Sequence, residues 1–144
     1  DKDNYIIRSL VIYKKTTLVS AAWKSIKFWD LNNKTFKGKI INAHANHIYS
    51  LLNIKSTKIL LSGGDDHKIR FWNIETLQEA TNHIELNSGV CCMTQLDSNI
   101  VAIGTTNCSI QCFNIYNKKT VMRVKTNHSG YIWKVIFVTI IGIY

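Results

Sequence analysis

Three side chains near the middle of the chain, His44, Ser62 and Asp66, are of the types that cooperate in hydrolytic enzymes. A histidine that is oriented by a carboxylate can remove the proton of a serine hydroxyl and make it a nucleophile. The same residue types also have a structural use, because a buried carboxylate is tolerated only when it is paired with hydrogen-bond donors. The elements that carry these residues must decide between the two uses.

An aromatic motif recurs along the chain at a nearly constant spacing. Phe28-Trp29-Asp30, Phe71-Trp72-Asn73 and Cys112-Phe113-Asn114 place their central aromatic residues 43 and 41 residues apart. Self-similarity with a period of about 40–45 residues is typical of the four-stranded blades of a β-propeller. One such repeat cannot bury its own apolar faces, so neighbouring repeats must stack against one another.

A second set of residues keeps the same register. Apolar segments begin at Ile7, Ile48, Val90 and Ile132, which stand 41, 42 and 42 residues apart. The runs that follow are short, β-branched and broken by turn signals, which indicates strands rather than helices. In the second repeat we expect strands over about residues 47–54, 58–62, 68–73 and 77–84. The prediction is an all-β fold, a β-propeller of about three four-stranded blades plus the first strand or strands of a fourth, with repeats at about 5–41, 44–84, 87–125 and from 128.

On these motifs the chain resembles the WD-repeat (WD40-type) family of β-propellers, and the resemblance covers nearly the whole sequence. It implies that His44, Ser62, Asp66 and Trp72 form a buried, hydrogen-bonded tetrad in the second repeat. His44 would pair with Asp66 and donate to Ser62, which would accept from the indole of Trp72. No substrate would reach such a packed position, so the resemblance implies a structural use and no enzyme activity.

The other repeats depart from this pattern. The first has Trp23 near the position of the turn aspartate. The third replaces the histidine, the aspartate and the tryptophan together, and a histidine returns ahead of the fourth repeat. These departures weaken the expected tetrads without changing the expected fold. The motif positions outside the tetrad are, in order, Trp29, Asp30, Asn73, Leu86, Asn107, Phe113 and His128.

The resemblance also implies where a protein partner would bind. Propellers of this family use the face that carries the loops between blades and the turns between the second and third strands of each blade. Tyrosine, tryptophan and arginine, which are enriched at binding hot spots, occur at the matching positions here. The alternative is that these are ordinary loop residues that pack on their own turns. The predicted partner face consists of Arg8, His47, Tyr49, Asp65, Tyr131 and Trp133, with Cys91 as the matching residue of the third repeat.

The charge of the chain suggests a second surface. The formal net charge is +9, from 18 lysines and arginines against 9 acidic residues. Several lysines fall in the turns at the opposite end of the blades, where they could attract RNA, acidic protein segments or anionic lipid. The alternative is that they only solvate the loops. This predicted basic face consists of Lys14, Lys15, Lys34, Lys55, Lys58, Lys118 and Lys119.

Other kinds of site find little support in the sequence. The four cysteines lack the paired spacing of a zinc site, so we expect free thiols in a reducing compartment, the cytoplasm or nucleus. No glycine-rich loop of the phosphate-binding kind is present, and we expect no metal and no cofactor. The apolar stretch 135–144 has about half the length of a membrane span and is expected to be a buried strand. The cysteines are Cys91, Cys92, Cys108 and Cys112.

Three blades do not close a ring, because propellers use about 4–8 blades. The two open ends would expose apolar faces, so we expect a piece of a longer, seven-bladed propeller whose remaining blades come from the same or another chain. The predicted function is a non-catalytic scaffold that binds other proteins, as peptide or domain ligands, within a multiprotein complex. The alternative is an electrostatic binder of RNA or an anionic membrane through the basic face.

Overall fold

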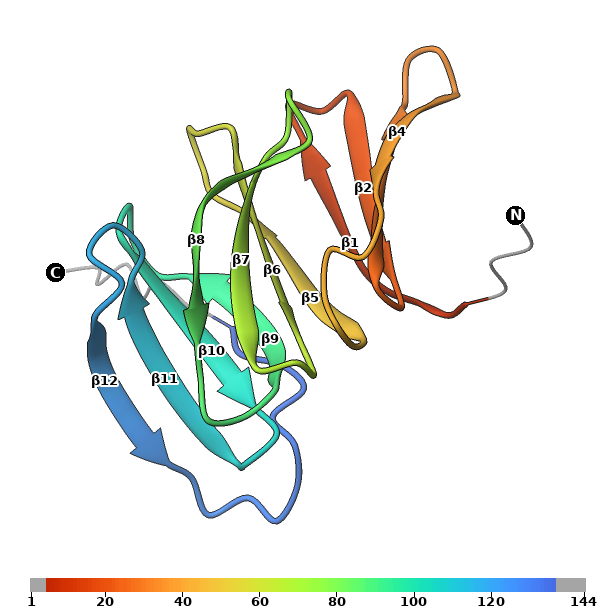
Figure 1. The fold of residues 1–144 in the computed structure, drawn as a ribbon. Helices are drawn as coiled ribbons and strands as arrows, with labels where there is room; N and C mark the ends of the chain where they lie inside the picture. Colours follow the sequence, from red (N-terminus) through yellow and green to blue (C-terminus); the bar gives the residue numbers. More distant parts are fainter. Residues whose placement is uncertain (1–4, 137–144) are drawn as a thin grey trace, which may run out of the picture.

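A computed structural model describes residues 5–136 of the chain, and these form twelve strands and no helix (Figure 1). All twelve strands are six to eight residues long, as expected for blades that are broken frequently by turns. The strands are β1 Ile7–Tyr13, β2 Thr17–Ala22, β3 Ser25–Asp30, β4 Thr35–Ile40, β5 Ile48–Asn53, β6 Ile59–Gly64, β7 Lys68–Asn73, β8 Gln78–Glu85, β9 Val90–Gln95, β10 Ile100–Thr105, β11 Ser109–Asn114 and β12 Thr120–Lys125.

The strands form three four-stranded antiparallel sheets, each ordered as in the sequence. We call β1–β4 blade 1, β5–β8 blade 2 and β9–β12 blade 3. The three sheets stand side by side like the leaves of a fan (Figure 1). The turns β1–β2 and β5–β6 lie at the upper end of this view, and the loops between blades lie at the lower end. The predicted all-β propeller architecture is confirmed, and in blade 2 each strand lies within two residues of its predicted bounds.

Burial differs between the inner and outer strands of a blade. In β6, five of the six residues are buried, as expected for a strand that has a neighbouring sheet on each face. In β12, all six residues are exposed. The second strand of blade 2 therefore supplies core residues, whereas the outer strand of blade 3 faces away from the core.

The core lies between the blades rather than within them. Leu60 and Trp72 of blade 2 pack with a cluster that includes Phe28 of blade 1. Leu61 and Phe71, their neighbours in the sequence, pack instead with residues of blade 3. Because successive side chains of a strand point to opposite faces, blade 2 contributes to two separate clusters. The sequence repeats with a constant period because each blade must present the same two apolar faces to its neighbours.

The outward face of blade 1 is open. Five large apolar side chains are exposed on its strands, namely Ile7, Leu10, Ile12, Trp29 and Phe36. A hollow of about 690 Å³ lies along this face, with Trp23 and Trp29 in its lining. The sequence predicted such an apolar face at an open end, and the described residues show it on blade 1.

The segment predicted to begin a fourth blade does not form a strand in residues 131–136. Residues 131–136 are not assigned to a strand, although Ile132 is buried and its N–H donates to the carbonyl of Thr105 at 3.3 Å. The thiol of Cys92 donates to the carbonyl of Ile132 at 3.2 Å. A strand is stabilised by pairing with a neighbour, and no further strand accompanies this segment within the described residues. The rest of the predicted strand, residues 137–144, lies outside them.

Candidate functional site

The structure brings His44, Ser62, Asp66 and Trp72 together in one chain of hydrogen bonds. Nδ1 of His44 donates to Oδ1 of Asp66 at 2.7 Å, and Nε2 of His44 lies 2.7 Å from the hydroxyl oxygen of Ser62. The indole N–H of Trp72 donates to the same oxygen at 2.7 Å. His44 belongs to the loop between β4 and β5, whereas the other three residues belong to blade 2. The chain of bonds thus fastens the loop between blades 1 and 2 to blade 2.

The carboxylate of Asp66 is satisfied on several sides. Its oxygens also accept from the backbone N–H of Ala45 at 2.9 Å and of Lys68 at 3.3 Å. Burial on its own would raise the pKa of Asp66, but the hydrogen bond and charge of His44 and the two backbone donors outweigh it. The pKa therefore lies below its ordinary value, and the side chain is held in its ionised form.

The connectivity Asp66–His44–Ser62 is that of a hydrolase triad, but its surroundings are not those of a nucleophile. Ser62 is 0% exposed, so its hydroxyl meets no solvent from which a substrate could enter. Its oxygen is also engaged by the indole of Trp72, which a triad serine does not require. This geometry suits a structural hydrogen-bond network, in which buried polar groups satisfy one another.

Blade 1 contains half of the same arrangement. The indole N–H of Trp29 donates to the hydroxyl of Ser20 at 3.0 Å, as Trp72 does to Ser62. Only the two residues Trp23 and Lys24 separate β2 from β3, whereas three residues separate β6 from β7. The turn of blade 1 is therefore one residue shorter than that of blade 2, and it holds no aspartate. Trp23 occupies this turn with a φ of 49°.

The motif residues at the end of the third strand serve the next turn. Oδ1 of Asp30 accepts from the backbone N–H groups of Asn32 and Asn33, both at 2.9 Å. The bond from Asn33 is the largest cause that holds the pKa of Asp30 below its ordinary value. In the same way, Oδ1 of Asn73 accepts from the N–H of Glu75 at 2.9 Å. These side chains fix turn geometry.

Blade 3 replaces the tetrad with a different polar cluster. Oδ1 of Asn107 accepts from the hydroxyls of Thr105 and Ser109, each at 2.8 Å. Phe113, at the tryptophan position, is buried, as is Leu86 at the histidine position. His128 is exposed, and in the described part of the chain no aspartate or serine of a fourth blade meets it. Its predicted place in a fourth repeat stays a prediction.

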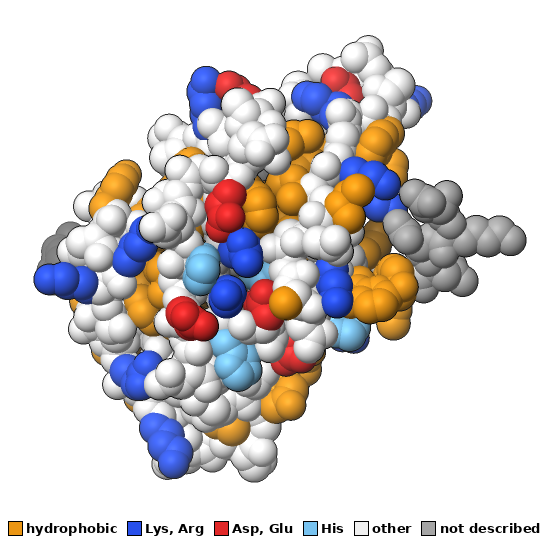
Figure 2. Space-filling model, viewed as in Figure 1, with side chains coloured by type: hydrophobic (Ala, Val, Ile, Leu, Met, Phe, Trp, Pro, Cys, Tyr) orange, Lys and Arg blue, Asp and Glu red, His pale blue; other side chains and the backbone are white. Residues whose placement is uncertain are grey.

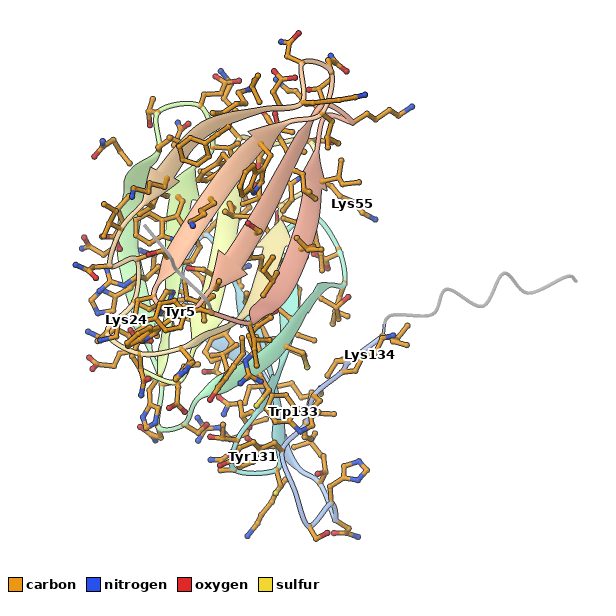
Figure 3. The ribbon with its side chains drawn as sticks, turned by 90° about the vertical axis from the view of Figure 1, so that its right-hand side faces the viewer. Tyr5, Lys24, Lys55, Tyr131, Trp133 and Lys134 are labelled. Atoms are coloured by element: carbon orange, nitrogen blue, oxygen red, sulfur yellow. The ribbon has the colours of Figure 1, made fainter. Side chains whose placement is uncertain are left out.

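Five of the six residues predicted for the partner face belong to one connected cluster. The rings of His47 and Tyr49 are stacked at 6.3 Å and 10°, and the ring of Trp133 meets Tyr49 edge-on at 5.7 Å. Tyr131 lies 5.5 Å from Trp133, and the guanidinium of Arg8 lies 5.6 Å above the ring of Tyr49. Figure 3 shows Tyr131 and Trp133 together at one end of the blades, with Lys55 at the opposite end.

Two aromatic residues that the sequence analysis did not select extend this cluster. Trp23 stacks on His47 at 6.0 Å and 19°, and Tyr5 meets Trp23 edge-on at 4.2 Å. The sequence analysis noted Trp23 only as a departure from the repeat motif. Its position in the turn between the second and third strands, which belongs to the partner face, could have identified it as a member of this cluster. The aromatic ladder, as we name it, runs through Tyr5, Trp23, His47, Tyr49, Trp133 and Tyr131.

Backbone contacts between blades fix the centre of the ladder. The carbonyl of Trp23 accepts from the N–H of Ile48 at 2.7 Å, which joins blade 1 to the start of blade 2. The carbonyl of His47 accepts from the N–H of Asp65 at 2.9 Å. A side chain at Gly64 would collide with this carbonyl, so the turn requires glycine there. The ladder is therefore carried by rigid connections between blades.

The remaining partner-face residues lie in different surroundings. Asp65 accepts from Nδ2 of Asn46 at 2.9 Å and is partly buried beside the ladder. Burial is the main cause that raises the pKa of Tyr49, and the charge of Asp65 adds to it. Cys91 is buried, so its predicted place on the exposed face is wrong. As the second residue of β9, which packs beside β5 of blade 2, it is 3% exposed and belongs to the core.

The predicted basic face is partly neutralised within the molecule. Glu75 forms ion pairs with Lys58 of the same blade at 2.6 Å and with Lys14 of blade 1 at 3.4 Å, and the second pair joins blades 1 and 2. Nζ of Lys118 donates to the carbonyl of Asn82 at 2.6 Å and lies over the ring of Phe71. Figure 2 shows one face of the molecule, where lysines and arginines are scattered over the blades with carboxylates between them. The other predicted members, Lys15, Lys34, Lys55 and Lys119, are all exposed.

The cysteines behave as core residues. All four are free thiols, and Cys91, Cys92 and Cys112 are buried. Burial raises the pKa of Cys91 to about 12, so this thiol is not a nucleophile at neutral pH. Residues 5–136 contain no cluster of His, Cys, Asp and Glu side chains that could hold a metal ion. In the same part of the chain, no helix has the length and apolar character to cross a membrane.

Comparison with known proteins matches these features to one family of repeats. The WD40 family (WD domain, G-beta repeat) matches residues 35–73, which cover β4 of blade 1 and β5–β7 of blade 2. The matched unit thus spans two blades, and it contains the whole tetrad. A stretch of 75 residues, half of this chain, is 35% identical to the CCR4-associated factor 4 homolog of Vanderwaltozyma polyspora, of whose length it covers 11%.

Solved structures of WD40 repeat proteins share this architecture. The structure of U3-55K and the crystal structure of RRP9 WD40 repeats each superpose with a TM-score of 0.80 over 91% of this chain. Both are 18% identical to it in sequence, and the chain covers 42% of each. At this identity the likeness describes the fold, and the chain spans less than half of the propellers it matches.

Proposed function

We propose, from the premise that this chain is part of a WD-repeat β-propeller, that it is a non-catalytic scaffold that binds another protein through the aromatic ladder. WD40 repeats generally serve as platforms for protein interaction. Because the chain spans 11% of its matched relative and 42% of the matched structures, the partners of those proteins are not transferred to it. The ligand we infer is a peptide or domain of another protein in a multiprotein complex.

The observation that carries this proposal is the ladder itself. Six rings from two blades and the segment after β12 form an unbroken series of contacts. At its two ends, Tyr5, Tyr131 and Trp133 keep about half of their surface exposed. Large amphipathic rings that are already ordered lose little conformational entropy when a partner covers them.

The test is comparative capture of proteins from the source cells with the tagged full chain. The double variant Tyr131→Ser and Trp133→Ser removes the exposed end of the ladder. Tyr116→Ser is the matched control, because Tyr116 is an exposed aromatic residue in the turn between β11 and β12 at the other end of blade 3. We expect a set of proteins that the control variant retains and the double variant loses. Identical sets for both variants would remove the support for the ladder.

The alternative function is electrostatic binding of RNA or an anionic membrane through the basic face. It is favoured by four exposed lysines that form no ion pair with another residue of the range 5–136, while the pairing of Lys14 and Lys58 with Glu75 weakens it. Salt dependence separates the two functions. A ligand that is lost steeply between about 50 and 200 mM salt would indicate the alternative, because each neutralised phosphate adds to the slope.

The proposal also includes location and assembly. Free, buried thiols suit a reducing compartment, so we place the protein in the cytoplasm or nucleus. The open apolar face of blade 1 suits a neighbouring blade, and we propose that the remaining blades come from the same or another chain. The same reasoning gives the repeats at 5–41, 44–84, 87–125 and from 128 as units of one larger ring.

A further inference from the structure

One end of the aromatic ladder contains a small hollow. It has a volume of about 210 Å³ and is lined by Tyr5, Ile6, Arg8, Trp23 and His47. Three of its walls are aromatic or imidazole rings and one is an exposed isoleucine. A space of this size and lining accommodates a single large side chain, whereas a folded domain could only cover it from outside.

One cation, Arg8, lines this hollow and a second, Lys24, lies against one of its walls, and neither has an acidic partner among the described residues. The guanidinium of Arg8 lies over the ring of Tyr49, and the ammonium of Lys24 lies 5.4 Å from the ring centre of Trp23. Among residues 5–136, no carboxylate lies within ion-pair distance of either group. Lys24 lines the neighbouring hollow along the open face of blade 1, which shares Tyr5 and Trp23 with the smaller one, and Figure 3 shows Lys24 and Tyr5 at the same end of the blades.

We propose that this hollow binds an acidic peptide segment of the protein partner. One aromatic or large aliphatic side chain of that segment enters the hollow and packs against the exposed sides of Tyr5, Trp23 and Ile6. Neighbouring carboxylates of the segment pair with Arg8, which can offer a bidentate hydrogen bond, and with Lys24. The inference rests on the proposed function, since it names the chemistry of the ligand at one end of the same ladder.

The geometry favours a peptide over a nucleic acid strand. Single strands bind by stacking successive bases on free ring faces along a cationic groove. Here the ring of His47 is stacked between Trp23 and Tyr49, and Arg8 and Lys24 already lie over the rings of Tyr49 and Trp23. These faces are occupied, and the two unpaired cations are gathered at one end. The same cations disfavour a basic ligand.

The experiment measures binding of short, fluorescently labelled probes to the full chain by anisotropy. The probes are a peptide of alternating Glu and Phe, a peptide of alternating Lys and Phe, a peptide of alternating Glu and Ser, and a single-stranded oligouridine. Arg8→Gln removes the guanidinium, and Trp23→Asn removes the ring while keeping a residue that tolerates a positive φ. Lys55→Gln, at the opposite end of the blades, is the charge-matched control. Circular dichroism establishes that each variant is folded.

We expect the Glu/Phe peptide to bind more tightly than the other three probes. Arg8→Gln should weaken it about tenfold, the effect of losing one charge-assisted hydrogen bond, while Lys55→Gln leaves it unchanged. Equal binding of the Lys/Phe peptide, tighter binding of oligouridine, no binding of any probe, or an unchanged affinity in folded Arg8→Gln would overturn the inference. If the partner were still lost from the Tyr131 and Trp133 double variant, the proposed function would stand while this inference failed.

Discussion

Blades 1 and 2 hold the same tryptophan–serine hydrogen bond in two different environments. In blade 2, Trp72 is 5% exposed, and Ser62 continues the chain of bonds to His44 and Asp66. In blade 1, Trp29 is 36% exposed, although its bond to Ser20 is formed at 3.0 Å. The difference comes from the neighbouring blade. Blade 1 packs over the face of blade 2 that carries Trp72, whereas among the described residues no blade packs over the face of blade 1 that carries Trp29.

The comparison shows that the tetrad is a device for joining neighbouring parts of the propeller. The bond between the second and third strands forms within a blade on its own. The histidine arrives from the loop that leaves the preceding blade, so the complete tetrad requires both. In blade 3, apolar packing replaces the tryptophan and the histidine of the tetrad. Phe113 and Leu86 are buried at these two positions.

The largest expected effect is on the tetrad of blade 2. Asp66→Ala should lower the free energy of unfolding by about 3 kcal/mol, because it leaves His44 and two backbone N–H groups without their acceptor. Asn107→Ala, at the matching position of blade 3, is the control and should cost about 1 kcal/mol, since Asn107 is exposed and accepts from hydroxyls that have other partners. Urea unfolding measures both. Equal losses of unfolding free energy would mean that the tetrad of blade 2 stabilises the fold no more than the polar cluster of blade 3.

A smaller effect should separate the two tryptophans. Trp72→Phe removes a buried indole N–H that donates to Ser62 and leaves unfilled space, and it should cost about 1.5 kcal/mol. Trp29→Phe removes the same bond from a partly solvated site and should cost less than about 0.5 kcal/mol. The measurement is again the urea midpoint. A loss for Trp29→Phe as large as that for Trp72→Phe would contradict the role assigned to the covering blade.

The smallest effect concerns pH. The pKa of Asp66 is lower in the folded chain than in the unfolded chain, so its ionised form stabilises the fold above a pH of about 4. This contribution is lost as the pH falls through the folded value. The difference in unfolding free energy between the native chain and Asp66→Asn should therefore shrink below about pH 4. A difference that stays constant down to pH 3 would show that the charge of Asp66 does not stabilise blade 2.

Much of the fold could be predicted from the sequence, because one period controlled both the aromatic motif and the apolar segments. The strands of blade 2 were placed within two residues, since their β-branched runs end in strong turn signals such as Gly63-Gly64. The segment 131–136 was expected to be a strand and is not assigned as one. The apolar pattern identifies what can pack, whereas strand formation also needs a partner.

The candidate site was predicted in part. Arg8, His47 and Tyr49 were selected by position in the repeat, and the structure brings them together. Trp23 was missed as a ladder member because the turn between β2 and β3 is one residue shorter than that between β6 and β7. Matching the repeats position by position does not reveal such a difference in turn length. The pairing of Lys58 with Glu75 was missed because contacts between turns depend on side-chain reach.

The aromatic ladder as the partner surface is the central claim, and hydroxyl-radical footprinting tests it most directly. The full chain would be oxidised alone and within its native assembly, and the modification of Tyr131 and Trp133 compared with that of Tyr116. We predict that the assembly protects both ladder residues and leaves Tyr116 unchanged. Equal modification of Tyr131 and Trp133 in the two states, with or without protection of Tyr116, would contradict the claim.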